Sequence, residues 1–236
     1  MSDKIWTVIP AAGIGTRMRR DIPKQYLQIN GRCVLDYALE TFCQHAQVEG
    51  VVVALAKDDP WWSTLELAGH KKVSTCEGGQ ERCHSVLNGL DKLLQSGASS
   101  DWVMVHDAAR PCLRREDIDS LIDEVSTGQE GGILAIPVRD TMKRGDTDRR
   151  VQETVDRSQL WHALTPQMFR LGALRAAIDG ALADGELVTD EASAMERAGA
   201  QVRLVEGHVD NIKITHPQDL LLANLYLSGQ EDSQCE

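Results

Sequence analysis

The chain has 236 residues, which is long enough for one large domain with a substantial core, and 42% of its residues are hydrophobic. Its formal net charge of −11 argues against a general nucleic-acid-binding protein, because phosphate backbones are held by basic surfaces. No window approaches the ~20 apolar residues of a membrane span, and the first residues lack the apolar core of a signal peptide. We therefore expect a cytoplasmic protein that does not span a membrane and whose anion sites are local.

Cysteine and histidine spacing favours neither a disulfide framework nor a zinc centre. The six cysteines form no CxxC pair and lie within apolar or helical patterns, at positions 33, 43, 76, 83, 112 and 235. In a chain of this length, such residues are more often free thiols of a reducing compartment than disulfide partners. The histidines show neither HExxH nor the Cys/His spacing of a zinc site, so we expect no dedicated zinc ion.

β-Prone runs alternate with amphipathic patterns through the first 138 residues. The expected strands are short apolar runs at 5–10, 51–56, 102–106 and 132–138. The expected helices carry apolar residues at helical spacing, at 33–46, 82–95 and 115–126. Strands separated by helices connect in parallel through crossovers. The pattern therefore predicts an α/β fold, with a mostly parallel sheet and helices on both of its faces.

The pattern changes after the fourth expected strand. Residues 139–160 are polar and charged, with β-prone residues on both sides of a Gly-Asp turn, and they predict an exposed hairpin arm. Beyond the arm we expect helices at 167–183 and 190–198, and then two short strands, RLVEG and NIKIT.

The end of the chain is typical of one more helix. A capping box from Thr215 to Gln218 predicts a helix that continues through DLLLANLYL. The last residues, GQEDSQCE, are polar and predict a frayed tail. No repeat or long linker divides the chain, so we interpret residues 1–236 as a single domain and residues 139–160 as its arm insertion.

Glycines and cations follow the first expected strand, in the stretch IPAAGIGTRMRRDIPKQY. Open parallel sheets bind ligands at this carboxyl edge, and Gly13 and Gly15 let backbone N–H groups approach phosphate oxygens. Arg17 and Lys24 add two full charges beside the glycines, which favours a phosphate-binding loop. Met18 stands where the dinucleotide-binding fingerprint has its third glycine, so that motif is incomplete. The alternative is a plain strand-to-helix turn with solvated cations.

An acidic residue follows another expected strand, in VMVHDAARP. Asp107 comes directly after the buried run, at the same carboxyl edge of the sheet. A carboxylate there can hold Mg²⁺, a hard cation that bridges carboxylate and phosphate oxygens. The alternative is that Asp107 caps the next loop or pairs with Arg110.

Two further stretches could complete such a site. In CEGGQERCHSV, a glycine pair opens a helix whose first turn contains Arg82 and Ser85, and backbone donors at a helix start suit recognition of a base or ribose. Lys213, in VDNIK, could return to the phosphate edge from late in the chain. The alternatives are an ordinary helix start and a surface lysine.

Seven motifs occur in one order along the chain: PAAGxGxRM…PKQY, EGGxxRxxSV, VHDAARP, PVRDTMK, VDR…LWxAxTPQ, TDEASAxE and VxGxxxNIKIT. Together they resemble the 2-C-methyl-D-erythritol 4-phosphate cytidylyltransferase family of the non-mevalonate isoprenoid pathway. The resemblance covers nearly the whole chain. It implies a Rossmann-like nucleotidyltransferase fold and a β-arm that interlocks two subunits as a homodimer. It also implies CTP and 2-C-methyl-D-erythritol 4-phosphate as substrates, Mg²⁺ as the cofactor, and a cytoplasmic biosynthetic role.

The resemblance also assigns roles to individual residues. It places Arg17, Lys24 and Lys213 on the reacting phosphates as catalytic cations and makes Asp107 the metal ligand. The residues implied to bind the nucleotide are Ala11, Ala12, Gly13, Gly79, Ser85 and Ala108. Those implied to bind the acceptor are Thr141, Arg157, Asp107, Asp210 and Thr189, with Arg157 reaching into the partner subunit's site.

The implied reaction is attack of a phosphate-monoester oxygen on the α-phosphorus of CTP. The second pKa of such an ester is ~6, so the attacking group is already mostly dianionic at neutral pH and needs no general base. The obstacle is repulsion between two anions, which positive side chains and a divalent ion would offset.

The sequence leaves three other functions to compare with this one. A ribitol 5-phosphate cytidylyltransferase would share most of the phosphate motifs, but TDEASAME looks more like the methylerythritol group. A non-catalytic nucleotide sensor would not need cations at the α-phosphorus. An NAD-dependent oxidoreductase would need the missing glycine and an acid at the end of a strand, whereas Asp36 lies in an expected helix.

Overall fold

The computed structural model describes residues 3–13, 22–96, 99–128 and 131–234, with side chains up to residue 230 in the last helix. Seven strands form one sheet in the order β11-β7-β10-β6-β1-β4-β5. Their bounds are β1 (Ile5–Pro10), β4 (Val48–Leu55), β5 (Val73–Glu77), β6 (Trp102–Val105), β7 (Gly132–Pro137), β10 (Trp161–Arg170) and β11 (Arg203–Glu206). Every neighbouring pair is parallel except those of β10, which runs antiparallel to β6 and β7. The predicted α/β fold with a mostly parallel sheet is confirmed.

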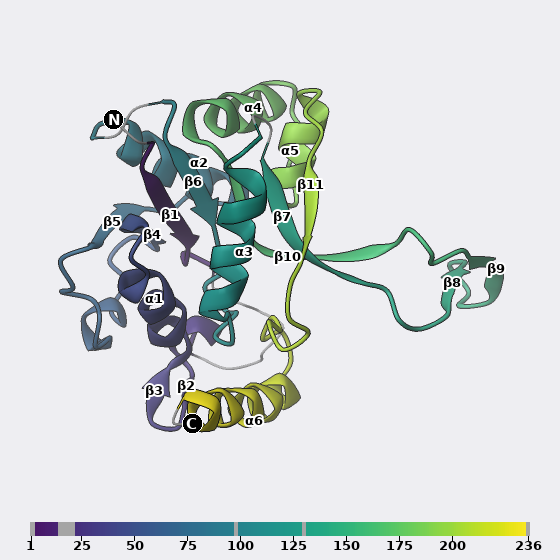
Figure 1. Ribbon diagram of the computed structural model, residues 1–236, viewed down its shortest axis with the longest axis horizontal. Coiled ribbons are helices and arrows are strands. Elements are labelled where there is room, and N and C mark those ends of the chain that lie inside the picture. The colour runs from purple at the N-terminus through teal and green to yellow at the C-terminus, as the bar shows by residue number, and fades with distance from the viewer. Residues whose placement is uncertain (1–2, 14–21, 97–98, 129–130, 235–236) are drawn as a thin grey trace.

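Helices cover both faces of this sheet (Figure 1). The longer helices are α1 (Val34–Gln44), α2 (Arg82–Leu94), α3 (Arg115–Val125), α4 (Leu171–Ala183), α5 (Glu191–Arg197) and α6 (Pro217–Gln234). Apolar residues of α1 and α3 share one core with Ile9 and Met104, while those of α2, α4 and α5 share another with Val8 and Val103. Adjacent strand residues thus point into opposite cores, which is why the central strands are continuous apolar runs.

Small elements connect the sheet to α6. The 3₁₀ turn η2 (Lys24–Tyr26) leads into a tight hairpin of β2 (Gln28–Ile29) and β3 (Arg32–Cys33). Apolar side chains of this hairpin and of α1 form a third core with α6. A second 3₁₀ turn, η3 (Trp62–Thr64), follows β4. Among the described residues, no helix combines the length and the apolar character that crossing a membrane requires.

Four local predictions were wrong. The helix expected from residue 167 begins only at Leu171, because 161–170 fill the slot between β6 and β7 as strand β10. The stretch NIKIT is not a strand; its Ile214 N–H binds the carbonyl of Ala109 in the loop after β6. Strand β5 was not predicted, because it lies at the sheet edge and lacks a continuous apolar run.

The fourth error concerns the cap and the end of the last helix, whose presence was predicted correctly. It starts at Pro217, and the Asp219 carboxylate accepts the backbone N–H groups of Thr215 at 2.8 Å and His216 at 2.7 Å. The helix continues to Gln234, through most of the predicted frayed tail. Gln230 helps to hold it, since its amide donates to the Cys112 carbonyl at 3.0 Å.

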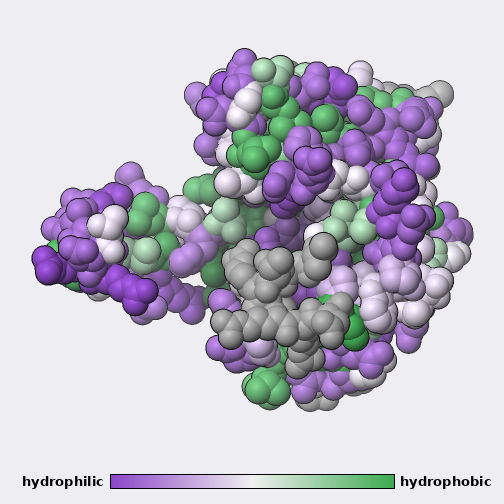
Figure 2. Space-filling model, turned by 180° about the vertical axis from the view of Figure 1, so that it is seen from behind, coloured by the Kyte–Doolittle hydropathy of each residue, from purple (hydrophilic) through white to green (hydrophobic). Residues whose placement is uncertain are grey.

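An arm leaves the body between β7 and β10 (Figure 1). It contains the antiparallel strands β8 (Met142–Gly145) and β9 (Val151–Val155), which pair with each other in a separate two-stranded sheet. The arm also stands clear of the body in the opposite view, with a largely hydrophilic surface (Figure 2). Its apolar side chains include Val151, which is 65% exposed, and Met142, which is 36% exposed.

Candidate active site

The loops after β1, β4 and β5 meet at the carboxyl edge of the sheet. The Ala11 N–H binds the Ala54 carbonyl at 2.8 Å, and the Gly78 N–H binds the Leu55 carbonyl at 2.7 Å. Gly78 lies so close to Ala12 that an added Cβ would overlap the alanine side chain. This approach needs glycine, and it brings two stretches of the predicted nucleotide site together.

The turn before α2 is held by the predicted site residue Ser85. Its buried hydroxyl accepts the Gly79 N–H at 3.0 Å and donates to the Glu81 carbonyl at 3.3 Å. An added Cβ on Gly79 would overlap His84, so this position also needs glycine. Ser85 therefore shapes the backbone of the turn. Of the other residues assigned to the nucleotide, Ala11 and Ala108 are buried, while Gly13 is exposed.

Lys24 joins the first loop to the end of the chain. Its ammonium group donates to the carbonyl of Ile214, at 2.9 Å and 190 positions away in sequence. The next residue, Gln25, donates to the carbonyls of Ala11 at 2.6 Å and Gly13 at 3.2 Å, which returns this segment to the end of β1. The structure thus brings Lys24 beside the segment that carries Lys213. Arg17 lies outside the described residues.

Asp107 is surrounded by three cations from different parts of the chain. Its Oδ1 accepts the Arg82 Nε–H at 3.0 Å, while its Oδ2 lies 2.8 Å from Lys213 Nζ and 3.4 Å from Arg110 Nε. Burial alone would raise the pKa of Asp107, but the three cations outweigh burial and hold that pKa well below its usual range. The carboxylate is therefore ionised at neutral pH. The pairing with Arg110, weighed as an alternative to metal binding, is present.

A buried hydrogen-bond relay supports the backbone of Asp107. The Asp107 N–H donates to the Thr165 hydroxyl at 3.1 Å, which lies 3.1 Å from His106 Nδ1. His106 Nε2 lies 3.0 Å from the Arg110 carbonyl and must carry the proton, because a carbonyl only accepts. Burial lowers the pKa of His106 to about 4, so this histidine is neutral at pH 7.

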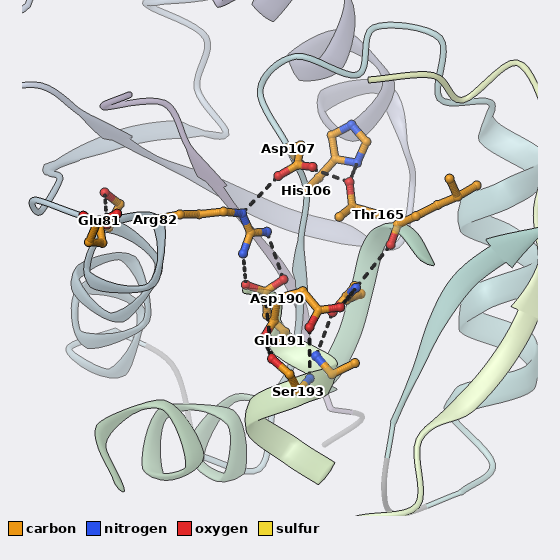
Figure 3. A network of polar contacts seen from close by, with 12 residues as sticks. Glu81, Arg82, His106, Asp107, Thr165, Asp190, Glu191 and Ser193 are labelled. Carbon is orange, nitrogen blue, oxygen red and sulfur yellow. Dashed lines mark hydrogen bonds and ion pairs between the residues drawn. The ribbon is translucent and has the colours of Figure 1, made fainter. Parts of the chain in front are cut away.

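The structure adds an acid that had not been singled out as a site residue. Glu191 binds Arg82 through both carboxylate oxygens, at 2.6 Å and 3.0 Å (Figure 3). Burial lowers the pKa of Arg82, but Glu191 and Asp107 outweigh burial and raise it, so Arg82 stays charged. Glu191 belongs to the TDEASAME motif, and its position in that motif was the one available signal.

Apart from Asp107, the residues predicted to bind the acceptor do not contact this cluster in the described part of a single chain. Thr141, just before β8, and Arg157, just after β9, are exposed, and Thr189 is exposed before α5. Asp210 is buried and faces the other way, with its Oδ2 2.5 Å from Arg114 Nη2 and 3.1 Å from Gln230 Nε2. Within the described ranges, none of these four side chains has an ion pair or hydrogen bond with the Asp107 cluster.

Asp107 fits poorly as a ready ligand for Mg²⁺. Both of its oxygens already bind cationic side chains, and a divalent ion beside them would be repelled. Magnesium also prefers several oxygen ligands, yet no three His, Cys, Asp or Glu side chains come together as a metal site in the described part of the chain. The expectation that Asp107 binds the metal therefore finds no support in this geometry.

Comparison with known proteins identifies one group of relatives. Residues 5–229 match the family model of 2-C-methyl-D-erythritol 4-phosphate cytidylyltransferase (IspD). A protein with that name from Ectopseudomonas mendocina is 57% identical over 221 residues, which cover 93% of this chain and 94% of the relative. One from Vibrio vulnificus is 52% identical over 225 residues, 95% of each chain.

Solved structures show the same likeness. The Francisella tularensis 2-C-methyl-D-erythritol 4-phosphate cytidylyltransferase superposes with a TM-score of 0.83 at 38% identity, covering 94% of this chain and 99% of that one. A 4-diphosphocytidyl-2C-methyl-D-erythritol synthase superposes with a TM-score of 0.84, also at 38% identity, covering 96% of this chain and all of the other.

Proposed function

The chain belongs to the 2-C-methyl-D-erythritol 4-phosphate cytidylyltransferase family, and we propose that its reaction takes place beside Lys24, Asp107 and Lys213. The enzyme transfers a cytidylyl group from CTP to 2-C-methyl-D-erythritol 4-phosphate, in isoprenoid precursor biosynthesis. The ribitol 5-phosphate alternative is not favoured, because the relatives named above carry the methylerythritol name. The site assignment depends on one observation: Lys24 contacts the segment that contains Lys213, at the edge of the sheet that is lined by glycines.

In the proposed mechanism, a phosphate oxygen of the acceptor attacks the α-phosphorus of CTP. A new P–O bond forms there, the bond to the β-phosphate oxygen breaks, and pyrophosphate leaves. Lys24 and Lys213, with Arg17, offset the repulsion between the two anions and the charge that develops in the transition state. The acceptor phosphate is already a dianion, so His106, which is neutral and buried, has no proton to remove from it.

We further propose that the nucleotide lies over the β1 and β5 loops. The close approach of Gly78 to Ala12 leaves backbone there without covering side chains, and Gly79 begins the turn into α2. Backbone groups in such turns suit the polar edge of a pyrimidine base and its ribose. Ala11, Gly13, Ser85 and Ala108 belong to the same proposed site, with Ser85 acting through the turn that it holds.

The arm is proposed to join two subunits. An isolated two-stranded hairpin is marginally stable in water, and this one presents Val151 and Met142 to solvent in a single chain. Burial against a second arm would cover those side chains. Thr141 and Arg157 would then contact the acceptor, with Arg157 in the partner's site. Asp210 and Thr189 remain proposed acceptor residues. For Asp210 this requires that the acceptor reach its Oδ1, a buried atom that has no hydrogen-bond partner among the described residues.

Magnesium and a cytoplasmic location remain proposals as well. Because Asp107 fits the ion poorly, we place Mg²⁺ with the phosphates of CTP, where it would neutralise part of their charge. Chelation of divalent ions should then abolish turnover, while the Asp107→Asn variant should still show a magnesium requirement.

The central experiment is a pyrophosphate-release assay with CTP, Mg²⁺ and 2-C-methyl-D-erythritol 4-phosphate, and with each omitted in turn. Lys24→Ala and Lys213→Ala should lower kcat by about 10²–10³ while circular dichroism shows a retained fold. Near-normal turnover in both variants would exclude the proposed reaction centre and leave the family assignment unaffected.

A further inference from the structure

Glu191 is a buried acid that the proposed phosphoryl chemistry does not use. Its side chain is 2% exposed, and it grips the Arg82 guanidinium with both oxygens. The Nε–H of the same guanidinium binds Asp107, and the other oxygen of Asp107 binds Lys213. Figure 3 shows Arg82 lying between the two carboxylates. The contacts therefore form a continuous chain from Glu191, through Arg82 and Asp107, to Lys213.

The start of α5 holds Glu191 in a fixed place. Asp190 is the N-cap residue of this helix, and its carboxylate accepts the Ser193 N–H at 3.0 Å. Gln167 of β10 binds the residues on either side of Glu191 in the sequence. Its amide donates to the Asp190 carboxylate at 2.9 Å, and its oxygen accepts the Ala192 N–H at 2.8 Å. Glu191 is thus tied to the central sheet, and its contact with Arg82 is anchored on a rigid element.

The negative charge of Glu191 offsets part of the positive charge around Asp107. Three cations, Arg82, Arg110 and Lys213, face two acids, Asp107 and Glu191. Without the Glu191 charge, all three cations would compete for Asp107 and would repel one another. Lys213 would be the first to leave Asp107, because its side chain is 39% exposed, whereas that of Arg110 is 9% exposed.

We propose that Glu191 is a positioning residue for cytidylyl transfer: by holding Arg82 against Asp107, it fixes the place of the Lys213 ammonium group at the phosphate-binding edge. The inference rests on the proposed assignment of Lys213 to the reacting phosphates. Glu191 itself touches no substrate. Its effect should appear in turnover, because displacing a catalytic group by about 1 Å can cost on the order of 10²-fold in rate.

Glu191→Gln is the main test, since it keeps the size of the side chain and removes its charge. We expect kcat to fall about 10- to 100-fold, while KM for CTP changes less than roughly threefold. Glu191→Asp keeps the charge and should recover part of the lost kcat. Both variants are first checked for the wild-type circular dichroism spectrum at the assay temperature.

Asp36→Asn is the matched control for simple loss of a buried acid. Asp36 is 1% exposed and accepts the backbone N–H groups of Leu67 at 3.1 Å and Glu66 at 3.4 Å. Within the described part of the chain it makes no hydrogen bond or ion pair with the Asp107 cluster. This variant should lose stability and keep the wild-type kcat. A kcat for Glu191→Gln that matches that of Asp36→Asn would overturn the inference.

A double-mutant cycle tests whether Glu191 acts through Arg82. Lysine cannot reproduce the three guanidinium contacts, so Arg82→Lys should lower kcat alone. Adding Glu191→Gln to it should cost less than about twofold more, whereas fully multiplied effects would refute the connection. Lys213→Ala separates the two proposals. Full turnover in Lys213→Ala would refute the site assignment. Loss of turnover in Lys213→Ala with normal turnover in Glu191→Gln would refute only the positioning role.

Discussion

Replacing Asp107 with asparagine should destabilise the fold through Arg110. The Arg110 side chain is 9% exposed and would lose its carboxylate partner, whereas the more exposed Lys213 can regain water and Arg82 keeps Glu191. An unpaired buried charge costs about 3–5 kcal/mol. Arg110 still donates to the Asn211 carbonyl at 2.6 Å, so we expect the lower value, about 3 kcal/mol. For a chain of this size, that corresponds to a fall in Tm of roughly 6–12 °C.

The assay is calorimetric unfolding of Asp107→Asn beside Lys213→Ala, at neutral pH and in acid. Lys213→Ala should lose less than about 1 kcal/mol, because its pair with Asp107 is partly exposed. Because the folded-state pKa of Asp107 is depressed, its stabilising contribution is present at neutral pH and is lost as pH falls below about 4. Asp107→Asn should remove that part of the acid sensitivity. A Tm for Asp107→Asn within about 2 °C of wild type would refute the claim that Asp107 stabilises the buried Arg110 charge.

Three other outcomes follow from the same contacts. The pKa of His106 is about 4 in the folded chain and 6.5 without burial, so the free energy of unfolding should fall as pH drops from 6.5 to 4. Urea titrations at pH 7 and 5 measure this loss, which should be smaller in His106→Gln. Gly78→Ala should raise KM for CTP, because its Cβ would force the loop away from Ala12; unchanged nucleotide kinetics would place CTP elsewhere. Arg157→Ala should raise KM for the acceptor and spare that for CTP, and an equal rise in both would contradict the assignment.

Burial on both faces explains which strands could be predicted from the sequence. The runs around Val8, Val52 and Val103 are continuously apolar because adjacent residues enter opposite cores. Strand β10 could not be recognised in this way, since residues 161–170 are a strand only because a slot remains between β6 and β7. Strand β5 lies at an edge, and its polar residues interrupt the apolar run that would have indicated a strand.

The candidate site shows the same division. Lys24 and Asp107 could be singled out because Lys24 follows a glycine loop and Asp107 ends a buried run, whereas the role of Lys213 was implied by the family resemblance. Their partners could not be predicted. Arg82 and Glu191 are 109 positions apart, and nothing local to either of them indicates the other. Asp210 lies three residues before Lys213 in the same motif, yet its side chain contacts Arg114 and Gln230 of α6.

The amino-acid sequence alone determined the α/β layering and, through motifs that resemble a known family, indicated the reaction class. Those properties depend on periodicity and on residue types within short segments, which are present before the chain folds. Only the tertiary structure decided that Asp107 binds three cations, that Glu191 restrains one of them, and that Lys24 meets the Lys213 segment. Ion pairs and hydrogen bonds act over a few ångströms in space, so they depend on distances that sequence order does not specify.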